Sequence, residues 1–172
     1  MSLSMDNRRA ISREYFSKSR LAEHHFRSFN AFLERGMQRV VDEKATIDTD
    51  IGDKEDEEPV FVELGEVRVV TPRVREADGS EELLYPQEAR LRNITYAAPV
   101  FMEMRIVRGG EEEEERVLDE SETKIGRMPI MVGSNKCNIT GFGWEELVEI
   151  GEDPADPGGY FIVNGSERVL MT

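Results

Sequence analysis

The side chains with the greatest potential for chemistry are two adjacent histidines, His24 and His25, which follow Glu23. Imidazole and carboxylate groups bind Zn²⁺, so this cluster suggests a metal site. The segment has a helical pattern, however, and neighbouring side chains on a helix point about 100° apart. Two such neighbours cannot bind one ion without distortion, and the sequence contains no further histidine. We therefore predict a structural or interface role for the pair and no metal site.

A second candidate is an acidic segment that contains Glu152, Asp153 and Asp156. Closely spaced carboxylates bind Ca²⁺ or act as an acid–base pair. The segment lacks the alternating Asp or Asn positions and the bidentate Glu of an EF-hand loop. A proline follows each aspartate, which favours turns whose carboxylates accept hydrogen bonds from nearby backbone N–H groups. We predict a rigid structural turn over 152–159.

No residue pattern in the chain indicates a catalytic centre. The sequence offers no convincing Ser/His/Asp or Cys/His set, and no glycine-rich phosphate loop precedes a helix. Cys137 is the single cysteine, which excludes an internal disulfide and a multi-cysteine zinc site. We expect it to be a buried or incidental thiol. The residues alone therefore predict a non-catalytic binding or structural module, with no catalytic, cofactor-binding or metal-binding side chains.

The strongest candidates for a binding surface are Arg90 and Arg92. Residues two apart on a helix lie on nearly opposite sides, so one guanidinium group is able to face outward while the other pairs internally. The alternative is that both hold the fold by pairing with Glu88, Glu76 or another carboxylate. Weaker candidates for a surface that contacts phosphates or other subunits are Arg73, Arg75, Arg127 and Lys136.

The N-terminal part of the chain, residues 11–44, is predicted to be helical. Its apolar residues recur at mixed three- and four-residue spacing, which is typical of one apolar helix face. We expect two helices, at roughly 11–19 and 21–43, with Ser12 as the N-cap of the first. Residues 1–10 are expected to be disordered or to be an expression remnant. An acidic linker over 48–58 follows the helices, because that stretch is almost devoid of apolar residues.

Residues 59–172 alternate between apolar and polar side chains and predict a β-rich region. The class is therefore α+β, with N-terminal helices packed on a mainly antiparallel sheet. The predicted strands are Val60–Pro72 with a bulge at Gly65, Thr95–Arg108 with Val100, Met102, Met104 and Ile106 on one face, and Lys124–Val132 with Pro129 at an edge or bulge. The predicted helices, turn and loop are Pro86–Arg92, Trp144–Ile150, a turn at 76–80 and a mobile acidic loop at 109–115.

The last fifteen residues predict a β-hairpin. Asn164-Gly165 favours a type I′ turn, because both central positions of that turn need positive φ. We expect the second strand to run from Arg168 to Thr172. A strand at the very end of a chain has unpaired edges, so we expect a piece of a larger protein that self-associates when isolated.

Composition bounds the remaining possibilities. The chain has 172 residues, 38% of them hydrophobic, which suits one domain with a modest core. Its apolar runs are too short for a membrane helix, and a single cysteine is typical of a cytoplasmic protein. There are 36 acidic and 22 basic residues, most of the latter arginine, for a net charge of −14. This balance argues against binding of free DNA and is typical of salt-adapted organisms.

Four blocks of the chain resemble, in order, the second-largest subunit of archaeal and eukaryotic multisubunit RNA polymerases. The blocks are His25–Leu33, Leu84–Tyr96, Gly126–Ser134 and Gly158–Val169. The resemblance covers about Tyr15 to the end and, with the acidity, suggests a haloarchaeal source, with the subunit either intact or split. It implies that 11–172 form the first part of the protrusion domain, cut near the start of the lobe.

The resemblance also implies a function for the chain. It suggests an architectural part of DNA-directed RNA polymerase, a nucleotidyltransferase: a wall of the DNA cleft and a surface for initiation factors. The implied partners are other polymerase subunits, above all the largest, together with template DNA, the RNA–DNA hybrid and general initiation factors. The Mg²⁺ and zinc sites of the family lie elsewhere. The alternative is a non-catalytic, stand-alone protein-interaction module.

Overall fold

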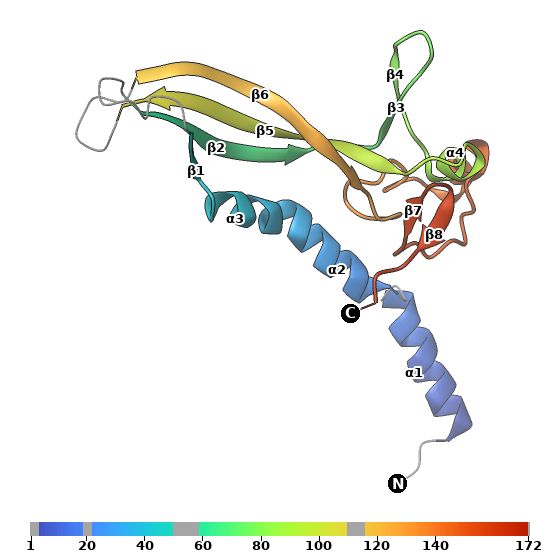
Figure 1. Ribbon diagram of the computed structural model, residues 1–172. Helices are drawn as coiled ribbons and strands as arrows, with labels where there is room; N and C mark the ends of the chain where they lie inside the picture. Colours follow the sequence, from blue (N-terminus) through green and yellow to red (C-terminus); the bar gives the residue numbers. More distant parts are fainter. Residues whose placement is uncertain (1–3, 19–21, 50–58, 110–115, 172) are drawn as a thin grey trace.

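The fold is built on one elongated antiparallel sheet with a long helix along one face and a cluster of short elements at one end (Figure 1). The computed structural model describes residues 4–18, 22–49, 59–109 and 116–171. The sheet order is β1-β2-β5-β6, and its strands are β1 Thr46–Asp48, β2 Val60–Val69, β5 Ala97–Arg108 and β6 Arg116–Pro129. The α+β class predicted from sequence is confirmed.

The first helix, α1, spans Met5–Lys18 and projects away from the sheet in Figure 1. It begins well before residue 11, because the hydroxyl of Ser4 accepts a hydrogen bond from the N–H of Asn7 at 3.2 Å and caps the first turn. Residues 5–10, part of a segment expected to be disordered or an expression remnant, are therefore helical, and the prediction of Ser12 as the N-cap is wrong. All described side chains of α1 are exposed.

The second helical region is continuous from α2 (Glu23–Ala31) through a π-helical turn, η1 (Phe32–Gly36), to α3 (Met37–Asp42). This confirms the helix predicted at roughly 21–43. Three residues on it, Phe29, Leu33 and Met37, pack against the main core at a spacing of four. In a regular α-helix each such step drifts by about 40° around the axis. The wider π-turn, closed by a bond from the Met37 N–H to the Phe32 carbonyl, compensates for this drift.

A bulge in β2 fixes α3 to the sheet. The pairing of β2 with β5 shifts register between Leu64 and Val67, which confirms the predicted irregularity at Gly65. The side chain of Gln38 on α3 receives a bond from the Val67 N–H at 2.9 Å and donates one to the Gly65 carbonyl at 3.2 Å. A helix side chain thus satisfies backbone groups that the bulge leaves unpaired.

The longest pairing in the sheet is between β5 and β6. The register confirms that Val100, Met102, Met104 and Ile106 share one face, since they lie opposite Val69, Val67, Leu64 and Val62 of β2. Strand β6 starts at Arg116, not at the predicted Lys124, and ends at Pro129 on the sheet edge. Two register shifts leave Leu118 and Ile125 of β6 without a partner residue on β5. These bulges twist the edge and make it a poor template for another strand.

The short elements gather at one end of the sheet, around the main core. They are β3 Arg73–Arg75, β4 Glu81–Leu83, α4 Pro86–Leu91, α5 Trp144–Glu149, β7 Phe161–Val163 and β8 Ser166–Arg168. Asn138 ties this end together, because its side-chain amide donates to the carbonyls of Pro72 at 2.8 Å and Leu84 at 2.7 Å. The main core consists of Val69, Leu84, Ala89, Tyr96, Ala98, Val100, Ile130, Val132, Cys137 and Ile162.

The terminal hairpin forms as predicted in its turn but not in its second strand. Asn164 and Gly165 have φ of 50° and 74°, as a type I′ turn requires. The second strand is β8, Ser166–Arg168, and the following residues through Met171 are not a strand, so the predicted Arg168–Thr172 strand is wrong. Three residues in β8 are enough to form the hairpin, because the tight turn at Asn164-Gly165 sets the register of β8 against β7.

Two of the predicted acidic segments fall largely outside the described residues. Of the predicted linker at 48–58, the structure describes only Asp48 and Thr49, and Asp48 belongs to β1. The loop at 109–115 is described only at Gly109. Within the described ranges, none of the helices has the length and apolar content needed to cross a membrane.

Candidate functional site

The first candidate site is centred on Arg90, whose guanidinium group joins three segments of the chain. Its Nε donates to Glu167 on β8 at 3.0 Å, and its Nη1 lies 3.5 Å from Glu152. Its Nη2 bonds Asp156 at 3.3 Å and the hydroxyl of Tyr160, which in turn donates to Asp156. Helix α4, the turn after α5 and the terminal hairpin are therefore held by one side chain.

Glu152 is the most buried carboxylate of this cluster, with 6% of its surface exposed. Its Oε1 accepts a bond from the backbone N–H of Gln87 at 2.6 Å, in the first turn of α4. Burial raises the pKa of Glu152, although the bond from Gln87 and the charge of Arg90 act in the opposite direction. Glu152 is thus an anchor for the start of α4.

The neighbouring aspartates confirm the predicted turn. Asp153 accepts a bond from the N–H of Ala155 at 2.8 Å, and Asp156 accepts one from the N–H of Gly158 at 2.8 Å. Both are bonds between a carboxylate and the backbone two residues later, which stabilise tight turns. These carboxylates therefore shape the chain that leads into the hairpin.

Arg92 pairs with a different set of carboxylates from Arg90. Its Nη1 bonds Glu76 at 2.6 Å and Glu88 at 2.7 Å. Both guanidinium groups therefore pair within the chain, as in the second of the two alternatives derived from the sequence. The Arg92 side chain is 39% exposed, so its ion pairs lie at the surface.

The four weaker basic candidates differ in their partners. Arg127 donates to the carbonyls of Arg73 at 2.9 Å and Ala97 at 3.1 Å, which fastens the start of β3 to β5. Arg73 and Arg75 are exposed on the β3–β4 hairpin, which stands out from the sheet in Figure 1, and Lys136 is half-buried. Within the described ranges, none of these last three side chains takes part in an ion pair.

The histidines and the cysteine have local partners. The rings of His24 and His25 lie 4.0 Å apart at their centroids, tilted by 40°. Cys137 is buried, as predicted, with its sulfur 3.3 Å from the hydroxyl of Tyr96. Among the residues with described positions, no three His, Cys, Asp or Glu side chains are grouped so as to hold a metal ion.

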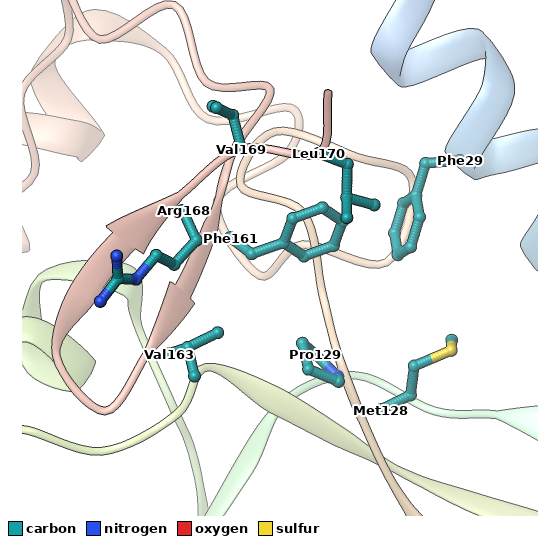
Figure 2. A pocket seen from close by; sticks show the side chains of 8 residues that line it. All are labelled: Phe29, Met128, Pro129, Phe161, Val163, Arg168, Val169 and Leu170. Atoms are coloured by element: carbon teal, nitrogen blue, oxygen red, sulfur yellow. The ribbon is translucent and has the colours of Figure 1, made fainter. Parts of the chain in front are cut away.

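The second candidate site is an apolar pocket of about 300 Å³ beside the terminal hairpin (Figure 2). It lies where α2, the end of β6 and the hairpin meet, and the residues after β8 close one side. Its lining residues are Phe29, Met128, Pro129, Phe161, Val163, Arg168, Val169 and Leu170. Sequence reasoning missed this pocket because we assigned 168–172 to a strand. The available signal was the apolar run Val169-Leu170-Met171 directly after the hairpin.

Comparison with known proteins places the chain. A family profile described as RNA polymerase beta subunit matches residues 20–172. The chain is 83% identical over 167 residues to a Halobacterium salinarum protein named DNA-directed RNA polymerase subunit Rpo2N, covering 97% of this chain and 32% of that protein. It is 43% identical over 169 residues to the Methanocaldococcus jannaschii protein of that name, covering 95% and 32%. It is 44% identical over 170 residues to subunit Rpo2 of Saccharolobus shibatae, covering 99% and 14%. The chain, which spans a third or less of these relatives, belongs to the RNA polymerase beta subunit family.

Proposed function

We propose that the chain is the N-terminal structural part of the second-largest subunit of a DNA-directed RNA polymerase. In this role it forms part of a wall of the DNA cleft and a surface for initiation factors during DNA-templated transcription in the cytoplasm of an archaeon. The observation that carries the proposal is the family match over residues 20–172. The nucleotidyl transfer and the Mg²⁺ and zinc sites belong to other parts of the enzyme.

The geometry supports a scaffold role. Arg90 and Arg92 are engaged by carboxylates of the same chain, and Arg127 is engaged by backbone carbonyls. Arg73, Arg75 and Lys136 are therefore the first candidates for contacts with nucleic-acid phosphates or with the largest subunit. Such phosphate contacts position a protein on template DNA or the RNA–DNA hybrid without reading sequence.

The apolar pocket supports a contact within the assembled enzyme. Val169 and Leu170 beside it are each 63% exposed, and Met171 is 92% exposed. Contiguous exposed apolar side chains of this kind mark protein–protein contacts. We propose that other parts of the polymerase cover them, and that the isolated chain self-associates through them.

The experiment that tests the assignment is purification of the tagged full-length gene product from its native source, with untagged cells as the control. The expected result is stoichiometric recovery of the largest polymerase subunit. Recovery of unrelated proteins without polymerase subunits would overturn the proposal and favour a stand-alone interaction module.

Light scattering of the isolated chain tests the apolar pocket separately. The variant Leu170→Ser should shift the chain towards monomer. An unchanged molecular mass would show that the pocket is not the contact through which the chain self-associates.

A further inference from the structure

Helix α5 carries an apolar ridge on its outer side. Trp144 is 66% exposed and Val148 is 57% exposed, and the two residues are four apart, so they lie on one face of the helix. Phe142, 37% exposed, comes just before the N-cap residue Gly143. Trp144 is the single tryptophan of the chain. Large apolar side chains gathered on an outer face indicate a contact surface.

An acidic edge runs beside this ridge. Glu145 and Glu149 are also four residues apart, and each lies about 100° around the helix from its ridge neighbour. Both are exposed. In the part of the chain that the structure covers, neither glutamate forms an ion pair. The ridge is therefore bordered by two negative charges that are available to a partner.

The support beneath the ridge is fixed by hydrogen bonds. The Glu146 carboxylate accepts a bond from the Gly143 N–H at 2.6 Å and so caps the helix. At the other end, the Leu147 carbonyl accepts a bond from the Glu152 N–H at 2.8 Å. Because Glu152 also anchors the start of α4, helix α5 is tied to the body of the fold. A ridge held in this way does not have to be ordered when a partner binds.

We propose that Phe142, Trp144 and Val148 form a docking surface for a basic polypeptide segment that carries apolar anchor residues. The anchors pack on the tryptophan ridge, and lysine or arginine side chains of the segment reach Glu145 and Glu149. Tryptophan is enriched among the residues that dominate binding energies, and charges at the rim select partners of opposite sign.

Local charge argues against two other occupants of the ridge. Nucleic-acid phosphates meet Glu145 and Glu149 at the edge of the ridge and are repelled. A second copy that docked through the same ridge would bring its own Glu145 and Glu149 against this pair. This docking proposal rests on Phe142 and the residues of α5 and does not depend on the proposed polymerase function.

The test uses the full chain and two synthetic peptides of equal positive charge. The first is a short lysine-rich peptide with two leucines four residues apart, and the second has serine in place of each leucine. Because Trp144 is the single tryptophan, its fluorescence reports on the ridge itself. We expect the leucine peptide to shift the Trp144 emission to shorter wavelength and to reduce quenching of that emission by acrylamide. We also expect it to bind about tenfold more tightly than the serine peptide. Equal affinity for the two peptides would show charge attraction alone and overturn the proposal.

Matched variants localise the binding. Val148→Ser should remove most of the preference for the leucine peptide, whereas Val40→Ser, at a valine on α3 with 58% exposure, should leave it unchanged. The double variant Glu145→Gln/Glu149→Gln should weaken both peptides more than the equally charged control Glu81→Gln/Glu82→Gln on β4. Equal effects of either pair would contradict docking at α5.

Salt separates the two contributions. In molar KCl the charge contribution is screened, since the Debye length falls to about 3 Å. The preference for leucine over serine should persist there, because burial of apolar surface does not depend on charge. Loss of that preference in KCl would count against the ridge as the anchor site.

Discussion

Gly159 lies so close to Ala22 that a Cβ added to the glycine would come within 2.4 Å of the Ala22 Cβ. Gly159 also has a φ of +86° and donates its N–H to the Val132 carbonyl at 2.9 Å. The residue before it, Gly158, would place a Cβ 2.6 Å from the same carbonyl oxygen. The paired glycines therefore let the segment leading into β7 pass between Ala22, just before α2, and Val132, just after β6.

Gly159→Ala should destabilise the chain more than Gly141→Ala. Both glycines have positive φ, so each substitution costs about 1 kcal/mol of backbone strain. Gly141 has open space around its Cβ position, whereas Gly159 faces Ala22, which adds about 1–3 kcal/mol of overpacking. Urea unfolding measures both. Equal losses would show that the contact with Ala22 relaxes at no cost.

Arg90→Ala should cost far more than Arg92→Ala. Removing Arg90 leaves buried Glu152 and half-buried Asp156 without their cation, a loss of about 2–4 kcal/mol. Arg92 pairs at the surface, where ion pairs contribute little, so its removal should leave unfolding nearly unchanged. Chemical denaturation of the two variants at neutral pH makes the comparison. A larger loss for Arg92 would reverse the roles assigned to these two arginines.

Glu152→Gln should change the pH dependence of stability. Because burial raises the pKa of Glu152 in the folded state, the free energy of unfolding falls as pH rises from the ordinary glutamate pKa through the raised one. Glutamine keeps an acceptor for the Gln87 N–H but does not titrate, so the variant should lack this fall. The measurement is denaturation of both proteins from pH 4 to pH 7. Parallel pH profiles would mean that the folded-state pKa of Glu152 is not raised.

The free energy of unfolding should increase from dilute buffer to molar KCl. With a net charge of −14, like charges repel in the compact state, and salt screens that repulsion. Exposed pairs such as Arg105 with Glu120 weaken at the same time, but they contribute little. Urea midpoints across a KCl series test this, with sucrose as the uncharged control. A flat KCl series would remove salt adaptation as the reason for the acidity.

The isolated chain should show no detectable binding to duplex DNA at physiological salt. Arg73, Arg75 and Lys136 neutralise too few phosphates to overcome the net negative charge. Anisotropy of a labelled duplex, with a basic DNA-binding protein as the positive control, is the measurement. Tight binding that falls steeply with salt would show a basic surface that the net charge conceals.

Local signals in the sequence predicted local structure well. Asn164-Gly165 specified the hairpin turn, and Pro86 marked the start of α4. The ion-pair cluster around Arg90 could not be predicted from sequence, because Glu152, Asp156 and Glu167 lie 62, 66 and 77 residues away along the chain. Sequence patterns report which face of an element is apolar, but they do not report which distant carboxylates a fold brings to one guanidinium group. The start of α1 was missed for a different reason, since Ser4 lies in a segment that we set aside as disordered or as an expression remnant.

The π-turn at Phe32–Gly36 determines which face of α3 points towards the sheet. If the same residues formed an uninterrupted α-helix, helix content measured by circular dichroism would barely change. Yet α3 would rotate by roughly one residue's turn, about 100°, about its own axis. Gln38 would then turn away from Gly65 and Val67, and the bulge in β2 would lose the side chain that fills it. The extra residue of the π-turn therefore keeps Gln38 on the face of the helix that meets the bulge in β2.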